Sequence, residues 1–334
     1  MNAEPRVLVA GATGFAGALA AHLIWRHPRL ALSAVTGRSD VGTTLERLYP
    51  RTRVPLPIEE LDLERHGDVD AAIVGYPHAA AAPVVAALRE RGVRVIDLSA
   101  DFRLRDRELY ERWYGPHPHP ELIAGAVYGL PELHREEIRG AGLVAGPGCY
   151  PTAALLGLAP LARAGLVADL VIDAKSGVSG AGRTPSAAVH FSRAGENVSP
   201  YKIGAHRHTP EIEEQLALLG ASLAIQFQPH LLPYDQGELL SCYVTPTRPV
   251  PGEEVAALYE QAYGHEPFVE VTDLPPGVRE VRDTNFCRIL PVVDDHTGKV
   301  LVFSSLDNLW KGTSSQALQS LNLMFGFPEG EGIE

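Results

Sequence analysis

The chain has 334 residues, of which 45% are hydrophobic, so its length and apolar content favour two domains with proper cores. Its formal net charge of −12 argues against nucleic acid or an anionic membrane as a partner, and an anionic substrate would need local arginines. The three cysteines form no CxxC pair, and no segment is typical of a secretion signal or membrane span, so we expect a cytoplasmic protein without a disulfide scaffold.

The first half of the chain alternates apolar runs with helical patterns. Strands are expected at residues 7–10, 31–35, 71–76, 93–98 and 142–145, with an amphipathic segment up to residue 27 and an alanine-rich helix at 79–91. This alternation predicts an α/β fold with a Rossmann-type, doubly wound parallel sheet.

The second half of the chain changes character after an expected helix at 151–164. Strand-like runs follow with few helices between them, at 170–175, 223–229, 239–245, 286–293 and 300–306. They predict an α+β domain with a mainly antiparallel sheet. The long segment 177–209 is rich in Gly, Ser, Pro and His and is typical of a functional loop. A last helix at 313–325 is expected to pack on the first domain, which predicts domains of 1–148 with 313–334, and of 149–312.

A glycine-rich turn follows the first predicted strand. Gly11, Gly14 and Gly17 fall in GATGFAG, with Thr13 and Phe15 in the same turn. Glycines at such a turn allow a tight bend and close approach of a pyrophosphate, which then faces a helix N-terminus. These five residues are therefore candidate dinucleotide ligands.

The end of the second predicted strand indicates which dinucleotide binds. NAD enzymes usually carry Asp or Glu there, whereas this chain has Thr36, Arg38 and Ser39. A guanidinium group and hydroxyls suit a 2′-phosphate, although Asp40 follows directly. We therefore expect NADP rather than NAD.

Cys149 lies in the run GPGCYPT, just before an expected helix for which Pro151 is a good first residue. At a helix N-terminus the dipole and the free N–H groups favour thiolate and can hold an oxyanion. Cys149 is thus the candidate nucleophile, whereas Cys242 and Cys287 lie in strand-like runs and are expected in the core.

The sequence around Cys149 resembles the active-site signature of N-acetyl-gamma-glutamyl-phosphate reductases. The resemblance covers essentially the whole chain, through the motifs GATGFAG, LSADFRL (98–104), YGLPEL (128–133), SGVSGAGR (176–183), HRHTPE (206–211) and DNLWKG (307–312). It implies a relative of aspartate-semialdehyde dehydrogenase, with a Rossmann domain and a glyceraldehyde-phosphate-dehydrogenase-like catalytic domain. It also implies an NADPH-dependent enzyme of arginine biosynthesis that acts on a small acyl phosphate and forms a homodimer or homotetramer.

The resemblance implies that Cys149 attacks the acyl phosphate and forms a thioester, which accepts hydride and collapses to an aldehyde. In HRHTPE, either His206 or His208 can carry the proton, because the imidazole pKa lies near neutrality. Related dehydrogenases carry His followed by Ser or Thr, which favours His208, beside Thr209. Glu211 is expected to orient a histidine or to cap a helix.

Further candidates come from the other matching motifs. Because arginine binds carboxylate and phosphate in a bidentate manner, three arginines are substrate candidates, and the resemblance adds one glutamate: Arg103, Arg183, Arg207 and Glu132. Asn308 resembles the family asparagine near the nicotinamide carboxamide, and the other cofactor candidates are Pro77, Ser179 and Gly180. The HPHP run at 117–120 lacks metal-site spacing, so we expect a surface loop there and no bound metal.

Two other functions remain open. One is a paralogue that reduces a carrier-protein-linked aminoadipyl or glutamyl phosphate in lysine biosynthesis, although CYPT keeps the arginine-pathway form and the net charge is unfavourable for an acidic carrier. The other, from a different class, is an NADP-binding redox sensor without catalysis, which would need neither an acyl-phosphate pocket nor HRHTPE.

Overall fold

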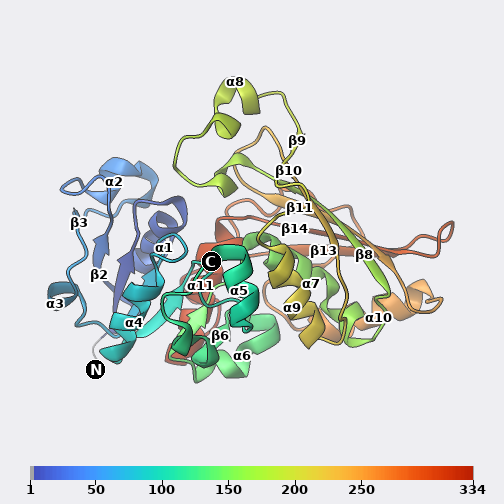
Figure 1. Cartoon of the computed structure of the whole chain (residues 1–334), viewed down its shortest axis with the longest axis horizontal. Helices are drawn as coiled ribbons and strands as arrows, with labels where there is room; N and C mark the ends of the chain where they lie inside the picture. Colours follow the sequence, from blue (N-terminus) through green and yellow to red (C-terminus); the bar gives the residue numbers. More distant parts are fainter. Residues whose placement is uncertain (1–3, 334) are drawn as a thin grey trace. The chain divides into compact units, whose positions relative to one another are not determined.

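The structure, a computed structural model, describes residues 4–333 and divides into two compact units (Figure 1). One unit is Met1–Gly148 with Thr313–Glu334, and the other is Cys149–Gly312. Residues 1–3 and 334 of the expected domain ranges lie outside the described residues. Within the described part of the chain, no helix is both long and apolar enough to cross a membrane.

The first unit contains a sheet of seven parallel strands in the order β3-β2-β1-β4-β5-β7-β6. The sheet extends to both sides of β1, which places the reversal of strand order between β1 and β4. The predicted doubly wound parallel sheet is therefore confirmed. The strands are β1 Arg6–Ala10, β2 Ala31–Thr36, β3 Ile58–Glu59, β4 Ala71–Val74, β5 Arg94–Asp97, β6 Ala126–Tyr128 and β7 Leu143–Ala145.

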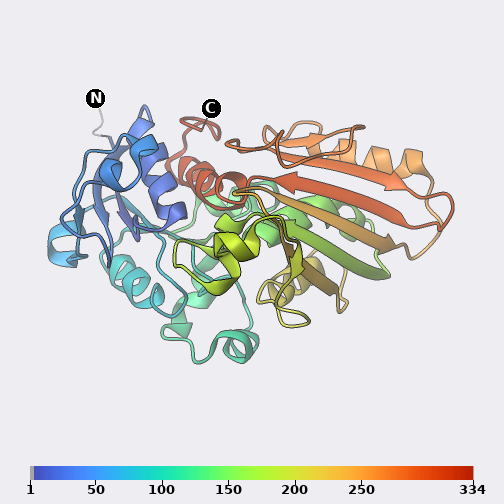
Figure 2. The same ribbon diagram turned by 90° about the horizontal axis from the view of Figure 1, so that it is seen from above.

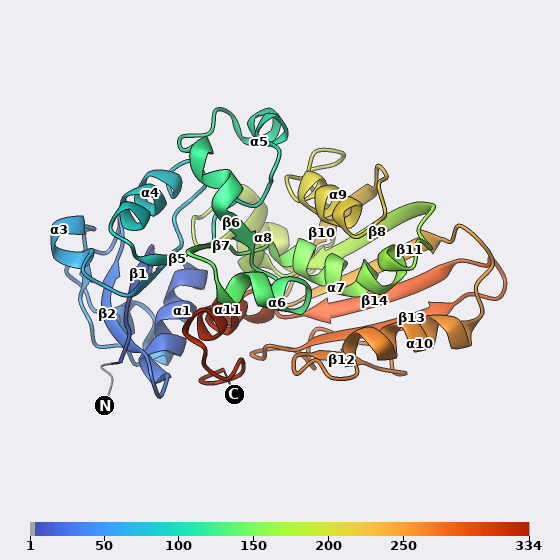
Figure 3. The same ribbon diagram turned by 90° about the horizontal axis from the view of Figure 1, so that it is seen from below.

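Helices cover both faces of this sheet, which is why β4 is buried along its whole length. Right-handed crossovers leave β1 and β4 in opposite directions, so α1 and α4 lie on opposite faces (Figure 3). Helix α11 packs against α1 and α6. The helices are α1 Phe15–Arg26, α2 Leu45–Leu48, α3 Leu63–His66, α4 Ala82–Glu90, α5 Arg107–Tyr114, α6 Pro131–Arg139 and α11 Ser315–Phe325.

The second unit contains another seven-stranded sheet, in the order β12-β13-β14-β11-β8-β10-β9. Its central strands are antiparallel, whereas β10 pairs with β8, and β12 with β13, in parallel. The predicted α+β architecture is confirmed, with a mixed sheet. The strands are β8 Asp169–Ser176, β9 Ser199–Pro200, β10 Gln226–Leu231, β11 Glu238–Thr245, β12 Val269–Val271, β13 Cys287–Val293 and β14 Val300–Leu306.

Three helices lie together along one face of the second sheet: α7 Cys149–Arg163, α9 Thr209–Leu218 and α10 Gly252–Tyr263 (Figure 3). Helix α7 packs directly on β11 and β14, and almost all of its residues are buried. The segment between β8 and α9 carries only short elements, including α8 Phe191–Ala194, and extends beyond the β9 edge of the sheet (Figures 1 and 2).

The structure differs from the sequence predictions at several places. Helix α7 begins at Cys149 rather than at Pro151. The first turn accommodates Pro151, because the N–H group that proline lacks would have no hydrogen-bond acceptor within the helix at this position. Helix α10 was not predicted, although Glu253 and Glu254 in its first turn suit a helix start. The last helix begins at Ser315, after a π-helical turn.

The expected surface loop at 117–120 is wrong for His117, which is 6% exposed. Its Nε2 donates a hydrogen bond to the Asp101 carbonyl oxygen at 2.6 Å, and its Nδ1 accepts one from the His119 backbone N–H at 3.0 Å. These bonds satisfy both ring nitrogens, so the imidazole holds the loop against the unit. In contrast, Cys242 and Cys287 are 1% and 0% exposed, which confirms their prediction as core residues.

Candidate active site

The glycine-rich turn between β1 and α1 leaves room only for backbone. Gly11 has a φ of +91°, and a Cβ added to it would lie 2.7 Å from the carbonyl carbon of Gly75. A Cβ at Gly17 would lie 2.3 Å from the Gly11 oxygen. Gly14 occupies the N-cap of α1, whose first turn carries no acidic side chain. The turn therefore fits a dinucleotide pyrophosphate at the helix N-terminus.

The end of β2 presents a cation beside an aromatic ring. The Arg38 guanidinium carbon lies 4.9 Å from the centre of the Tyr76 ring, and both Arg38 and Ser39 are exposed. Thr36 is buried, and its hydroxyl oxygen lies 3.5 Å from that of Tyr76. Pro77, next to this tyrosine, is exposed just beyond β4. Arg38 and Ser39 are thus accessible at the edge where a dinucleotide ribose binds in such sheets.

Two other members of the GATGFAG turn are held by one tyrosine of the same unit. The Tyr49 hydroxyl donates a hydrogen bond to the Thr13 carbonyl oxygen at 2.8 Å. The Phe15 ring contacts the Tyr49 ring edge-on, with centroids 6.2 Å apart. The turn is therefore fixed from outside as well as by its glycines.

Cys149 is the first residue of α7 in the second unit and is partly buried. The Cys149 Cβ approaches Gly312 so closely that a Cβ added there would lie 2.9 Å away. The thiol therefore lies at a helix N-terminus, where the partial positive charge of the dipole stabilises developing negative charge on sulfur.

Aromatic and imidazole rings surround the residue after the cysteine. The Tyr150 ring meets the His206 and His208 rings edge-on, at centroid distances of 5.7 and 5.9 Å, and the two imidazoles are 4.8 Å apart. The hydroxyl oxygens of Tyr150 and Tyr201 are 3.0 Å apart. Helix α7 and the 206–208 segment are thus brought together, as the pairing of nucleophile and histidine requires.

The two histidines make different contacts. Burial, reinforced by His208 and Lys202, lowers the pKa of His206 to about 3. His206 Nδ1 accepts a hydrogen bond from the His208 backbone N–H at 3.2 Å, which leaves the ring proton on Nε2. His208 occupies the N-cap of α9. Glu211, buried in the first turn of that helix, opposes the lowering of the His206 pKa by its charge.

Three predicted cofactor residues of the second unit lie together. The Asn308 side-chain amide donates to the Ser179 hydroxyl at 3.0 Å and accepts from the Gly237 backbone N–H at 2.6 Å. A Cβ added to Gly180 would lie 3.9 Å from the Asn308 Nδ2 atom. Asn308 therefore joins the SGVSGAGR segment to the start of β11.

Sequence reasoning missed one titratable residue of this region, Glu238, at the start of β11. Its side chain is fully buried, and the Cys149 thiol opposes the rise that burial causes in the Glu238 pKa. The available signal was an acidic residue at the head of the otherwise apolar strand ELLSCYV. An acidic residue at the start of a strand is expected to be exposed, so the sequence did not indicate that the tertiary structure would bury it.

The candidate arginines have different surroundings. Arg103 is buried in the first unit, where its guanidinium donates to the carbonyl oxygens of Gly146 and Leu98 at 2.8 and 2.9 Å. Arg183 is exposed after β8, and Arg207 lies partly buried between the two histidines. Arg207 is thus the candidate beside the imidazoles, whereas Arg103 holds backbone groups of its unit.

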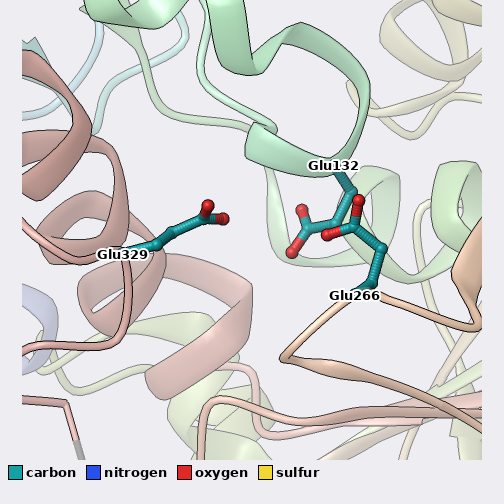
Figure 4. A group of neighbouring side chains, drawn as sticks. All are labelled: Glu132, Glu266 and Glu329. Carbon is teal, nitrogen blue, oxygen red and sulfur yellow. The ribbon is translucent and has the colours of Figure 1, made fainter.

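Glu132 belongs to the first unit and participates in a polar network there. Carboxylate oxygens of Glu132 and Glu329 lie within 4.8 Å of each other (Figure 4). The Gln319 amide donates to both, at 3.1 and 2.7 Å, and Arg135 forms an ion pair with Glu329. Donors between the two carboxylates compensate for their mutual repulsion.

The sequence has clear relatives. It matches the family described as semialdehyde dehydrogenase, NAD binding domain, over residues 6–141, and that described as semialdehyde dehydrogenase, dimerisation domain, over 149–308. N-acetyl-gamma-glutamyl-phosphate reductase from Dehalococcoides mccartyi (strain CBDB1) is 49% identical and aligns over 96% of this chain and 95% of its own. The reductase of the same name from Desulforudis audaxviator is 48% identical, over 98% and 97% of the two chains. This chain belongs to the N-acetyl-gamma-glutamyl-phosphate reductase family.

Membership of the N-acetyl-gamma-glutamyl-phosphate reductase family confirms the resemblance read from the motifs, and it makes the chain an oxidoreductase. Solved structures agree on the fold. Aspartate semialdehyde dehydrogenase II from Vibrio cholerae has a TM-score of 0.75 at 18% identity, over 97% of this chain and 99% of its own. Aspartate semialdehyde dehydrogenase from Candida albicans, solved with NADP, has a TM-score of 0.72 at 15% identity, over 96% and 98%. The family match and the glycine turn together indicate a nicotinamide dinucleotide as cofactor.

Proposed function

We propose that this chain reduces N-acetyl-gamma-glutamyl phosphate to N-acetylglutamate 5-semialdehyde with NADPH, releasing phosphate, as a step of arginine biosynthesis. The observation that carries the proposal is that Cys149 is the first residue of α7 and that the next residue, Tyr150, contacts the imidazoles of His206 and His208, in a chain 49% identical to a reductase of that name.

In the proposed reaction, the Cys149 sulfur attacks the acyl carbon, and the bond from that carbon to the phosphate oxygen breaks. A thioester forms, and the phosphate takes up one proton. NADPH supplies hydride to the thioester carbonyl. The C–S bond then breaks, which releases the aldehyde and restores the thiol.

Each proposed role follows from the surroundings of a residue. His208 is the proton carrier, because the lowered pKa of His206 keeps that ring neutral. Backbone N–H groups at the start of α7 hold the oxyanion. Arg207 and Arg183 bind the anionic groups of the substrate, and Asn308, with Ser179 and Gly180, orients the nicotinamide end of the cofactor.

NADP rather than NAD is proposed from the end of β2. Arg38 is exposed and lies against the Tyr76 ring, where its guanidinium is available to a 2′-phosphate. The family match to a dimerisation domain over 149–308 further supports a homo-oligomer, in keeping with the expected dimer or tetramer.

The test is phosphate-dependent reduction of NADP by N-acetylglutamate 5-semialdehyde, measured beside aspartate semialdehyde. We expect turnover with the acetylated semialdehyde and none above background in the Cys149→Ser variant. Turnover with aspartate semialdehyde alone would overturn the substrate, and reduction only of a carrier-protein-linked semialdehyde would assign the chain to lysine biosynthesis. An enzyme inactive with every semialdehyde would instead fit a redox sensor.

A further inference from the structure

Glu238 is a buried carboxyl group without an ion-pair partner. It is the first residue of β11 and lies between Ser176 of β8 and Leu306 of β14 in the register of the sheet. Its side chain is 0% exposed, and no side chain of the described residues forms an ion pair or hydrogen bond with its carboxylate oxygens. Glu238 pairs with Leu306 across the sheet, and a Cβ added to Gly312 would lie 3.2 Å from the Leu306 Cδ1 and 2.9 Å from the Cys149 Cβ, so Cys149 adjoins the side chain that neighbours Glu238. Burial of an unpaired carboxylate is costly, so the position requires an explanation.

The backbone around Glu238 is held firmly, which fixes where the carboxyl group lies. The preceding Gly237 has a φ of +119°, its N–H binds Asn308, and its carbonyl oxygen accepts from the Gly177 N–H at 3.0 Å. The Glu238 carbonyl oxygen accepts from the Ser305 hydroxyl at 2.9 Å. Helix α7 packs on the same strand, and the Cβ of its first residue, Cys149, approaches Gly312 beside Leu306, the sheet neighbour of Glu238.

The titratable groups around Glu238 are acids and phenols. Asp307 follows β14, Tyr150 comes from α7, Tyr201 follows β9, and Tyr234 precedes β11; each interacts electrostatically with the Glu238 carboxyl group. Burial raises the pKa of Glu238 to about 8, with a further increase from Asp307 and an opposing decrease from the Cys149 thiol. The group therefore changes protonation state in the pH range in which enzymes work.

We propose that Glu238 is a second proton-transfer residue of the site, whose ionised carboxylate takes the Cys149 thiol proton during attack and returns it when the aldehyde leaves. This inference rests on the proposed role of Cys149 as nucleophile. In the first step the S–H bond breaks, an O–H bond forms on Glu238, and the sulfur bonds to the acyl carbon. In the last step the C–S bond breaks and the Glu238 proton passes back to sulfur. The proton that the leaving phosphate takes up comes from His208, which then takes another proton from solvent. Glu238 therefore ends each cycle in the protonation state in which it began.

The direct test is the pH dependence of Cys149 alkylation by iodoacetamide, measured from pH 5.5 to 10 by intact mass on the full chain. A coupled thiol–carboxyl pair loses its two protons in separate steps. We therefore expect the wild-type rate to rise in two steps, and the rate of Glu238→Gln to rise in one. The Cys149→Ser variant reports any labelling of the buried Cys242 and Cys287. A single step in wild type, or superimposable wild-type and E238Q profiles, would overturn the pairing.

Asp97 provides a matched control, because it is another fully buried carboxyl group whose pKa burial raises, to about 7, but it belongs to the first unit. Asp97→Asn should keep the two-step profile, and loss of a step in this variant would also contradict the pairing. In turnover, E238Q should lower kcat about 100-fold with KM changed less than about threefold. An unchanged kcat would refute the transfer step. Alkylation requires neither substrate nor cofactor, so it separates failure of this pair from failure of the proposed substrate.

Discussion

Burial determines which side chains near Cys149 can exchange protons. His206 lies two positions before His208 in one motif, and burial lowers the pKa of His206 to about 3. Its Nδ1 is occupied by the His208 N–H, so His206 serves as a neutral hydrogen-bond acceptor that braces the start of α9. Glu238 shows the opposite effect of burial, which favours the neutral form of an acid.

The two histidines should therefore respond differently to mutation. We expect His208→Asn to lower kcat by about 10²–10⁴-fold, the usual contribution of a general acid–base. His206→Asn should cost less and keep the pH dependence of kcat, because a ring with a pKa of about 3 stays neutral over the working range. The measurement is kcat against pH for both variants. If the part of the kcat–pH profile that depends on histidine protonation disappeared in H206N but not in H208N, the two roles would be reversed.

Arg38 should determine cofactor preference. In Arg38→Ala we expect KM for NADPH to rise about 10- to 100-fold, the value of a charge-assisted hydrogen bond, with little change for NADH. Arg248→Ala is the control, because this exposed arginine pairs with Glu254 in the other unit. A wild-type KM that already favours NADH would contradict the NADP assignment.

At the scale of elements, α7 carries the proposed nucleophile, and one of its carbonyl groups lacks a helical donor and is bound by the neighbouring helix α10 instead. Pro160 lies inside the helix and has no N–H group to donate to the Leu156 carbonyl oxygen. The Tyr263 hydroxyl of α10 donates to that oxygen at 2.5 Å, and Tyr259 binds the Gly157 oxygen at the same distance. Helix α10 thus stabilises the helix whose first residue is Cys149.

Removal of the Tyr263 hydroxyl group tests whether its hydrogen bond to α7 stabilises the protein. Tyr263→Phe should lower the free energy of unfolding by about 1–3 kcal/mol, because a buried carbonyl group loses a donor while the ring packing is kept. Tyr243→Phe, on a partly exposed tyrosine of β11, should leave stability nearly unchanged. Chemical denaturation monitored by circular dichroism gives both values. Equal effects in the two variants would argue against a stabilising hydrogen bond from Tyr263.

At the scale of the whole molecule, buried acids in both units link stability to pH. Asp97 and Glu238 have folded-state pKa values of about 7 and about 8, above the ordinary values of 3.8 and 4.5 for these side chains. A raised folded-state pKa means that the stabilisation is complete below the unfolded-state pKa and is lost as pH rises through the folded-state value. The folded chain holds protons that the unfolded chain releases.

We therefore expect the thermal unfolding midpoint to fall between pH 6.5 and pH 8. Asp97→Asn and Glu238→Gln should each flatten this fall, because the amide binds no proton in either state. Scanning calorimetry across this range checks the prediction. A midpoint that rises with pH in wild type, or variants with the wild-type slope, would show that other groups dominate.

Much of this arrangement was predictable from local patterns. The apolar run before GATGFAG predicted β1 and the turn, and the alternation of strands and helices predicted the doubly wound sheet. GPGCYPT predicted a helix that starts at Pro151, just after Cys149. The observed helix α7 starts two residues earlier, at Cys149 itself. The short elements between 177 and 209 and helix α10 were missed, because their signals are weak without the surfaces on which they pack.

The sequence by itself determined the fold class and the family and indicated Cys149 as the candidate nucleophile, because glycine turns, strand periodicity and the GPGCYPT motif act over a few neighbouring residues. Only the tertiary structure decided the environments of the side chains. It packed His206 against Tyr150 and placed His208 at the N-cap of α9, and it buried Glu238 at the start of β11, the strand on which α7 packs. Burial and long-range contact set protonation states, and neither is encoded in any one segment of the chain.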